Sequence, residues 1–476
     1  MTRVEQTSLF APGAGGVSLQ ANMSAAKLLG KRTHQMPGRL NVSELFFEVP
    51  KDYAKPQSGS LRLFARSVER FEKPVDASKK EVRQPPWFLY LQGGPGMSCK
   101  SPQSYAWTNY VLDKGYQILF LDQRGTGLSS TITARTLASE GGPAQQADLL
   151  KNFRADSIVK DCEAIRKTLT SDFPEEKKKW SIMGVSFGGF CAVNYLSRFP
   201  EGLQEVFTVG GLPPLVRDPY PVYNRLFRKV KQRNEIYYQK YPEDIHRVKD
   251  IVRHIQKEED VKLPSGGTLS VLRLRQLGMH FGFHGSMDSV HDMITRFTSD
   301  LNQSGFFTRP TLAAFGAMIP LRHGPAVRPA ARAHLRPGDR PRLGRRPLPG
   351  APPRLRPPPP STGPTPSSSP ANRSRAPCSP TSPSCAASPT SRTGSRASRT
   401  GRRCTTGARL AANEVPVYAA TFVEDMYVDF DFARETASRI GRCKTFVTNV
   451  LYHDALVHRT DELLKQLFAL RDDTID

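Results

Sequence analysis

Ser186 is the residue best placed for nucleophilic chemistry in this chain. It stands in Gly184-Val-Ser-Phe-Gly188, the spacing in which a serine is raised on a sharp turn between a strand and a helix. Glycines at the flanking positions let the strand and helix backbones pass close together. The helix N-terminus beyond the turn stabilises the negative charge that develops during attack. The pattern predicts a nucleophilic serine, and an inert tight turn is the alternative.

A serine nucleophile needs a general base, and the base needs an acid that orients it. When the serine lies on a strand–turn–helix motif, the chain order is serine, acid, histidine. We expect His453 to be the base, because it follows a strand predicted over residues 444–447. His458 is the alternative, and its surroundings predict an exposed helical residue.

The orienting acid should lie just beyond the strand that ends near Thr421. We expect Asp425 in this role, since it stands 28 residues before His453 and leaves room for one helix and one strand. Asp429 and Glu424 are the alternatives. A carboxylate at this point could also serve only as a helix N-cap.

Attack on a carbonyl creates an oxyanion that two backbone N–H groups must stabilise. One donor is expected from Phe187, the residue after the nucleophile. The second is expected from Gly94 in Gly93-Gly-Pro-Gly96, because glycines let the backbone approach a substrate closely. A plain tight turn is the alternative for this loop.

The elements around these residues alternate between strand and helix patterns, which is the signature of an α/β fold. Short runs that are apolar on both faces predict central parallel strands covered by helices. Segments 43–49 and 60–68 alternate in part and predict antiparallel edge strands. The apolar runs cover residues 87–91, 117–122, 180–183 and 415–421, and helices are predicted over residues 155–170 and 461–470.

Composition and periodicity divide the chain into five segments. Residues 214–320 are helical and amphipathic with few strand signals, so we interpret them as a helical cap inserted into the α/β core. Residues 1–40 show little periodicity and predict a loose N-terminal arm. The core itself is assigned to residues 41–213 and 413–476, and an Arg- and Pro-rich segment occupies residues 321–412.

The Arg- and Pro-rich segment carries most of the net charge of +24. Residues 321–410 hold eighteen arginines, a single acid, 19 of the 40 prolines and no Ile, Phe, Tyr, Trp or Met. Such a composition cannot bury enough apolar surface to fold alone. It fits a solvated linker, a basic module for SH3-like domains or RNA, or GC-rich coding DNA translated out of frame. We favour the last interpretation because the edges of the segment are abrupt.

Reading the transcript across codons 321 to 412 tests this interpretation. We expect one shifted frame to restore lysine, glutamate and aromatic residues in the segment. A transcript that confirms the printed frame would instead favour the linker.

Several broad classes are excluded or disfavoured. No run of 18 or more apolar residues occurs, so we expect no membrane-spanning helix, and the first residues lack the pattern of a secretory signal. Outside the Arg-rich segment the charge is modest, so no nucleic-acid partner is expected. Seven cysteines without a CxxC spacing favour a reducing, cytoplasmic compartment. They predict no metal site, and we expect no cofactor.

Three motifs in this order resemble the proline iminopeptidases, which are serine peptidases of the α/β-hydrolase fold. They are Gly93-Gly-Pro-Gly96, Asp122-Gln-Arg-Gly-Thr-Gly127 and Gly184-Val-Ser-Phe-Gly-Gly189. The resemblance is to a fungal-type branch and covers about residues 40–320 and 413–476. It implies a mostly parallel central sheet with an inserted helical cap.

The resemblance also implies an activity, namely release of an N-terminal residue, preferably proline, from peptides with a free N-terminus. It implies Ser186 as the nucleophile that forms an acyl-enzyme, His453 as general acid and base, and Asp425 as the orienting acid. The Asp122-Gln-Arg-Gly-Thr-Gly127 segment would be a structural loop near the site.

The chain departs from this family where the cap should supply acids for the substrate's amino group. A semi-buried ammonium must be paired with a carboxylate, yet the chain has no glutamate between Glu259 and Glu414. Glu235 and Glu243 are the candidate partners, and solvated helix residues are the alternative. Competing functions are an esterase or amidase with the same triad, or a catalytically impaired product with a disrupted cap. An epoxide hydrolase or dehalogenase is disfavoured, because those enzymes carry an aspartate where Ser186 stands.

Overall fold

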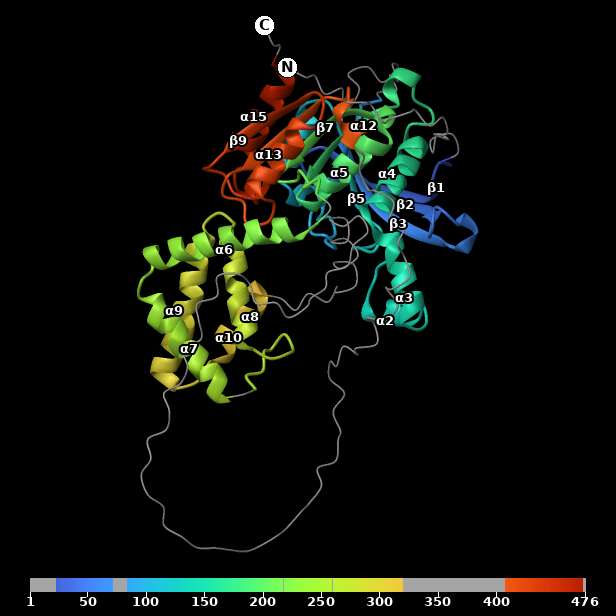
Figure 1. Ribbon diagram of the computed structural model, residues 1–476. Coiled ribbons are helices and arrows are strands. Elements are labelled where there is room, and N and C mark those ends of the chain that lie inside the picture. Colours follow the sequence, from blue (N-terminus) through green and yellow to red (C-terminus); the bar gives the residue numbers. More distant parts are fainter. Residues whose placement is uncertain (1–22, 72–83, 217, 259, 320–406, 474–476) are drawn as a thin grey trace, which may run out of the picture.

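The computed structural model describes residues 23–71, 84–216, 218–258, 260–319 and 407–473. These residues form a nine-stranded sheet with the strand order β1-β2-β3-β5-β4-β6-β7-β8-β9, flanked by helices (Figure 1). Strands β4 to β9 are mutually parallel, whereas β1 to β3 pair antiparallel and β3 joins β5 antiparallel. The strands are β1 (Lys27–Met36), β2 (Leu40–Pro50), β3 (Ser60–Arg70), β4 (Trp87–Leu91), β5 (Gln117–Asp122), β6 (Trp180–Val185), β7 (Leu203–Val209), β8 (Val417–Phe422) and β9 (Cys443–Thr448).

Helices belong either to this core or to a separate helical unit. The core helices are α1 (Trp107–Asp113), α2 (Ala134–Ala138), α3 (Pro143–Leu150), α4 (Ala155–Leu169), α5 (Phe187–Arg198), α12 (Gly407–Ala411), α13 (Phe430–Ser438), α14 (Ala455–His458) and α15 (Thr460–Asp472). The helices of the cap are α6 (Tyr220–Lys240), α7 (Asp244–Glu258), α8 (Val271–Leu274), α9 (Ser286–Ser304) and α10 (Arg309–Met318). Among the described residues, no helix is both long and apolar enough to cross a bilayer.

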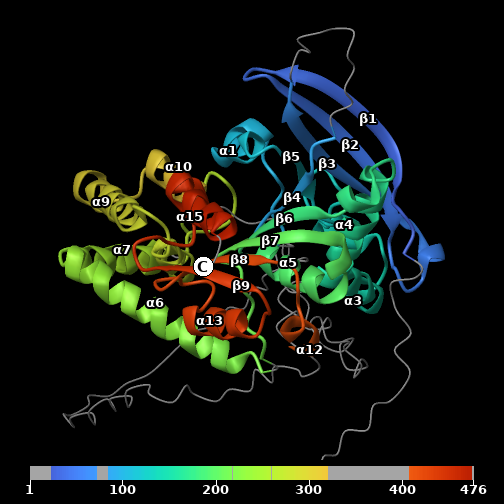
Figure 2. The same cartoon turned by 90° about the horizontal axis from the view of Figure 1, so that it is seen from above.

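The central strands are buried on both faces because helices cover each side of the sheet. Along β4, Leu89 and Leu91 pack into one cluster with α4 and α5, while Phe88 and Tyr90 pack into another with α1 and α15. This assignment follows from the period of two in a strand, which sends successive side chains to opposite faces. Figure 2 shows α1 and α15 on one side of the sheet and α4 and α5 on the other. The predicted α/β-hydrolase core of parallel strands is confirmed.

The cap has a hydrophobic core of its own. Buried residues of α6, α7, α9 and α10, among them Tyr237, Ile251, Phe297 and Phe315, form a third cluster. Among the described residues, Met426 in the loop after β8 is the one buried member of this cluster that comes from the α/β core. The cap therefore folds around its own apolar centre and touches the α/β core at a loop next to the expected catalytic acid. Figure 1 shows the cap helices gathered beside the C-terminal elements β9 and α13.

Two segment boundaries differ from the sequence prediction. Residues 27–36, assigned above to the loose arm, form β1, which pairs with β2 along its whole length. Its side chains are almost all exposed, so the sequence carries no apolar alternation that could have revealed the strand. Residues 407–411, assigned to the Arg- and Pro-rich segment, form α12, whose Leu410 is fully buried. The rest of that segment, 320–406, and residues 1–22 lie outside the described residues.

Arg124 ties the loop after β5 to the rest of the core. Its guanidinium donates two hydrogen bonds to Asp161 on α4, at 2.6 and 2.5 Å, and three more to the carbonyls of Pro50, Lys51 and Asn152. Neither charged side chain is exposed by more than 1%. Arg124 therefore has a structural role, and the expectation that the whole Asp122–Gly127 segment is a structural loop stays a prediction.

We expect Arg124→Ala to lower the free energy of unfolding by about 3–5 kcal/mol, because it leaves the Asp161 carboxylate buried without its counter-charge. Arg124→Lys should recover little, since one ammonium cannot reproduce the five-donor fork. Urea unfolding measures both changes. Arg253→Ala is the control, because its pair with Asp250 is exposed and should be worth well under about 1 kcal/mol. A loss below about 1 kcal/mol for Arg124→Ala would contradict the structural role.

Candidate active site

The parallel sheet brings five loops to one edge. Ser186 follows β6, Asp425 follows β8 and His453 follows β9, while the 93–96 loop follows β4 and Asp122 ends β5. Because these strands are parallel, their carboxyl ends share an edge, which is where α/β sheets bind ligands. The parallel order of the strands therefore brings to one edge of the sheet residues that are up to 360 positions apart in the sequence.

Ser186 occupies a strained turn. Its backbone angles are φ 54° and ψ −121°, and it is the N-cap residue of α5. Such a positive φ is uncommon for a residue with a side chain, and it marks functional turns. The flanking glycines are required by packing: a Cβ on Gly188 would lie 1.9 Å from the carbonyl oxygen of Leu91, and one on Gly184 would lie 2.4 Å from that of Gly188. The structure thus has the sharp strand–turn–helix geometry that the glycine spacing predicts.

Asp425 and His453 form a hydrogen-bonded pair. The Oδ2 atom of Asp425 lies 2.7 Å from Nδ1 of His453, and the carboxylate is only 1% exposed. Its other oxygen, Oδ1, accepts hydrogen bonds from the backbone N–H groups of Tyr427 and Val428, at 2.7 and 2.9 Å. The carboxylate is therefore fixed by three donors. With Nδ1–H donating to Asp425, the Nε2 atom of the imidazole is left as the basic nitrogen.

A backbone hydrogen bond connects the serine turn to the end of β7, and the residue that follows β7 lies against this pair. The N–H of Ser186 donates to the carbonyl of Val209 at 2.9 Å. The next residue, Gly210, lies directly against the pair, since a Cβ there would stand 3.0 Å from His453 Nδ1 and 3.3 Å from Asp425 Oδ2. The structure therefore gathers the expected nucleophile, base and acid around the ends of β6 to β9.

The glycine loop lies against the serine. A Cβ on Gly93 would stand 3.1 Å from Cβ and 3.7 Å from Oγ of Ser186. The following residue, Gly94, has a φ of 127°, which favours glycine. Gln123 donates from Nε2 to the carbonyl of Gln92 at 3.0 Å and so supports the start of this loop. The loop predicted to supply the second oxyanion donor is thus placed beside the nucleophile.

The alternative acids and the alternative base have other partners. Glu424 pairs with Lys229 on α6 at 3.3 Å. Asp429 is the N-cap of α13, where its side chain accepts the N–H of Phe432. His458 ends α14 with a side chain that is 55% exposed, as expected, and its Nε2 lies 3.2 Å from Oδ2 of Asp454. These contacts leave Asp425 and His453 as the pair that lies at the site.

Sequence analysis overlooked Tyr427. Its ring centroid lies 4.7 Å from that of His453, and its hydroxyl donates to the carbonyl of Met279 in the cap. Burial raises the pKa of Tyr427, and the carboxylates of Asp425 and Asp454 raise it further. The phenol therefore stays neutral and serves as a donor. Its position two residues after the expected acid was the only signal for it in the sequence.

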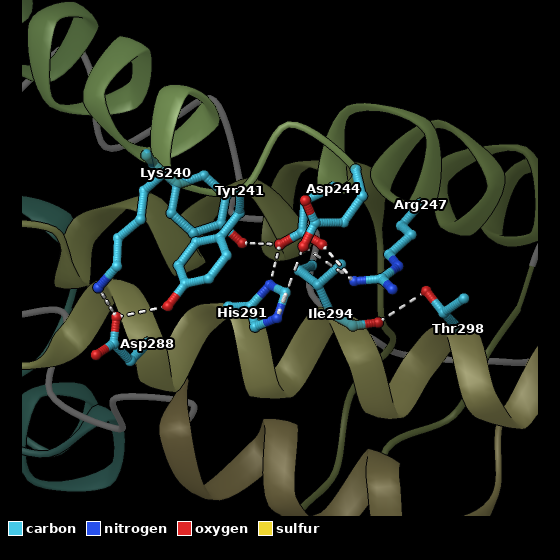
Figure 3. A network of polar contacts seen from close by, with 10 residues as sticks. Lys240, Tyr241, Asp244, Arg247, Asp288, His291, Ile294 and Thr298 are labelled. Carbon is cyan, nitrogen blue, oxygen red and sulfur yellow. Dashed lines mark hydrogen bonds and ion pairs between the residues drawn. The ribbon is translucent and has the colours of Figure 1, made fainter.

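The two predicted amine-binding residues have local partners in the cap. Glu235 is 58% exposed and lies 3.7 Å from Lys231 on the same helix. Glu243 lies 3.8 Å from Arg247 and 4.0 Å from His291, two residues of the polar network in Figure 3. No hydrogen bond or ion pair within the described residues joins either carboxylate to the residues around Ser186. Their role in binding an amino group stays a prediction.

The same network contains a group of side chains that could in principle ligate a metal ion, namely Glu243, Asp244 and His291. Asp244 is fully buried, but its oxygens already accept from Tyr237, from Arg247 at 3.0 Å and from His291 at 2.9 Å. Figure 3 shows the contact between Asp244 of α7 and His291 of α9, which joins these two helices. The contacts give the group a structural role in the cap.

An apolar cavity of about 760 Å³ lies between the cap helices and the loop after β8. Its wall includes Tyr223, Phe227, Met426 and Tyr427. Tyr427 thus lines the cavity and also contacts the expected catalytic histidine.

The mostly parallel sheet and the serine turn at its carboxyl edge define an α/β hydrolase. A family model described as "alpha/beta hydrolase fold" matches residues 86–258. Over 97% of its length the chain is 42% identical to the proline iminopeptidase aneH of Aspergillus aculeatus, of which it covers 100%. It is also 31% identical over 92% of its length to a proline iminopeptidase of Aeromonas sobria, covering 99% of that protein. The chain belongs to the proline iminopeptidase family.

The choice of acid can be tested by substituting the three carboxylates one at a time. We expect Asp425→Asn to lower kcat by about 10³- to 10⁴-fold, because the amide stabilises neither the required tautomer nor the imidazolium. Glu424→Gln and Asp429→Asn are matched controls and should change kcat by less than about tenfold. Steady-state hydrolysis of proline p-nitroanilide measures all three. A larger loss in either control than in Asp425→Asn would show that the acid is misassigned.

Proposed function

We propose that this protein is a serine aminopeptidase that releases an N-terminal residue, preferably proline, from peptides through an acyl-enzyme on Ser186. The observation that carries the proposal is the 2.7 Å contact between Asp425 and His453 beside the strained Ser186 turn. Membership in the proline iminopeptidase family, with relatives so named matched over nearly their full lengths, supports the substrate class.

In the first half-reaction, Oγ of Ser186 attacks the carbonyl carbon of the N-terminal residue while Nε2 of His453 takes the hydroxyl proton. Asp425 stabilises the imidazolium through Nδ1–H. The N–H groups of Phe187 and Gly94 are proposed to stabilise the oxyanion of the tetrahedral intermediate. The imidazolium then protonates the leaving amine as the C–N bond breaks, and an ester with Ser186 remains.

In the second half-reaction, His453 accepts a proton from water, and the resulting hydroxide attacks the ester carbonyl. A second tetrahedral intermediate forms and collapses. The C–O bond to Ser186 breaks, the proton returns from Nε2 to Oγ, and the free amino acid leaves. The site regains its starting protonation, so the residues described account for both steps.

An exopeptidase of this kind must also recognise a free amino group. Transfer of an ammonium from water into a semi-buried site requires a carboxylate partner. Glu235 and Glu243 are the proposed partners, and each would have to exchange its present contact with Lys231 or Arg247 for the substrate. A peptide substrate and a cytoplasmic location are part of the same proposal. The four described cysteines are free thiols, which is compatible with a reducing compartment.

The requirement for an amino group separates this proposal from an esterase or amidase with the same triad. We expect proline p-nitroanilide to be hydrolysed at least about 100-fold more efficiently, in kcat/KM, than its N-acetyl derivative, because acetylation removes the charge that the carboxylates bind. A panel of small p-nitrophenyl esters completes the comparison. Equal rates for the free and acetylated substrates, with faster ester hydrolysis, would favour the esterase.

Ser186→Ala should abolish both turnover and labelling by a fluorophosphonate probe, because no other hydroxyl lies on the strained turn. Ser289→Ala, at an exposed position on α9, is the control and should keep both. The measurements are release of p-nitroaniline and the mass of the labelled protein. Labelling that persists in Ser186→Ala would contradict the assignment of the nucleophile.

A further inference from the structure

The cap rests on the two loops that carry the proposed acid and base. From α6, Lys229 pairs with Glu424 at 3.3 Å, next to the acid. Arg225, also on α6, lies 3.4 Å from Asp429, the N-cap of α13, and 3.2 Å from Asp431 in the first turn of that helix. The cap is thus attached to the chain segment on both sides of the proposed catalytic acid.

A second attachment comes from the cap segment between residues 279 and 285, which precedes α9. Besides the hydrogen bond from Tyr427 to the Met279 carbonyl, the ring of Phe283 stacks on Tyr427 with centroids 5.0 Å apart. Gly282 leaves room for this contact, since a Cβ there would lie 2.6 Å from the tyrosine ring. The cap segment is therefore packed tightly on the residue that contacts both Asp425 and His453.

The third attachment is a second Asp–His pair beside the first. Asp454 follows the proposed base in the sequence, and its Oδ1 lies 2.6 Å from Nδ1 of His284 in the cap segment. The backbone N–H of His284 donates to both oxygens of Asp454, at 3.1 and 3.3 Å. The two side chains are only 14% and 13% exposed. The charge-assisted contact therefore lies in a largely desolvated environment, where it is strong.

The hydrogen bonds define the state of His284. The backbone N–H of Tyr452 donates to its Nε2 at 3.4 Å, so Nε2 is the acceptor and Nδ1 carries the proton that points to Asp454. His284 thus contacts residues on both sides of His453 in the chain. Arg233 on α6 also contacts this loop, because its guanidinium lies 5.0 Å from the centroid of the Tyr452 ring.

We propose that Asp454 and His284 are a positioning pair that holds the His453 loop against the cap, so that alignment of the base with the serine depends on cap docking. The inference rests on the proposed function. The proposed base stands between Tyr452 and Asp454, and both are held by a single cap side chain. A small displacement of a catalytic group from its productive geometry lowers the rate about 100-fold without removing the substrate's binding contacts. Loss of the pair should therefore lower kcat more than it changes KM.

The test uses the chain of residues 1–476, four single-residue variants of it, and proline p-nitroanilide as substrate. We expect Asp454→Asn and His284→Ala each to lower kcat by about 10- to 100-fold while KM stays within about threefold. His284→Asn keeps an N–H near the position of Nδ1 and should restore most of the activity lost in His284→Ala. Asp461→Asn, exposed on the neighbouring helix α15, is the matched control and should behave as wild type.

Two further measurements separate positioning from a general effect on folding. Melting temperatures should stay close to that of the wild type for Asp454→Asn, which preserves the shape of the side chain. In the double variant Asp454→Asn, His284→Ala, the loss in kcat should be well below the product of the two single losses, because both variants remove the contact between Asp454 and His284. Unchanged kcat in Asp454→Asn and His284→Ala would overturn the proposal. Additive losses accompanied by a lower melting temperature, with no recovery in His284→Asn, would also overturn it.

Fluorophosphonate labelling keeps this test independent of the peptidase assignment. Labelling of Ser186 needs the nucleophile and base but no amino-group recognition. If the wild type fails on proline p-nitroanilide, the proposed function fails, and the labelling rate still reports on positioning. A 10- to 100-fold slower labelling of Asp454→Asn then supports the pair, and labelling at the wild-type rate contradicts it.

Discussion

The hydrogen bond between Asp425 and His453 is the interaction around which the rest of the structure is arranged. It joins the loops after two neighbouring parallel strands, β8 and β9. A carboxylate with 1% exposure is unfavourable unless several donors surround it. Two backbone N–H groups and the imidazole satisfy that need. These hydrogen bonds offset the cost of burying the Asp425 carboxylate. They also fix the orientation of the His453 imidazole.

The serine turn imposes a second constraint, which is steric. The turn requires a positive φ at Ser186 and places α5 almost in contact with β4. Only glycine fits at positions 184 and 188, since any Cβ there would overlap backbone atoms. The Arg124–Asp161 pair anchors the loop after β5. Its charge serves to hold backbone carbonyls in place and takes no part in the proposed chemistry.

The cap supplies its own hydrophobic core and touches the α/β core mainly through charged and aromatic side chains around the acid and histidine loops. Ion pairs, hydrogen bonds and ring stacking require well-defined side-chain positions but bury little apolar area. They join the cap to the α/β core, although each of these units folds around a hydrophobic cluster of its own. The proposed Asp454–His284 pair extends this pattern. It places His284 of the cap against the loop after β9, which carries His453.

The amino-acid sequence by itself determined the class of fold, the serine turn and the order of the three expected site residues. It did so because these features depend on local patterns: apolar runs, glycines at fixed spacing, and short motifs beside them. Sequence did not reveal β1, since an edge strand whose side chains face solvent has no apolar alternation. Nor did it reveal Tyr427, Asp454 or His284 as neighbours of the site. The last of these comes from the cap, about 170 residues before its partner. Only the tertiary structure decided the contact between His284 and Asp454. The two segments that carry these residues approach each other when the cap docks on the ends of the parallel strands, and no local sequence pattern records that docking.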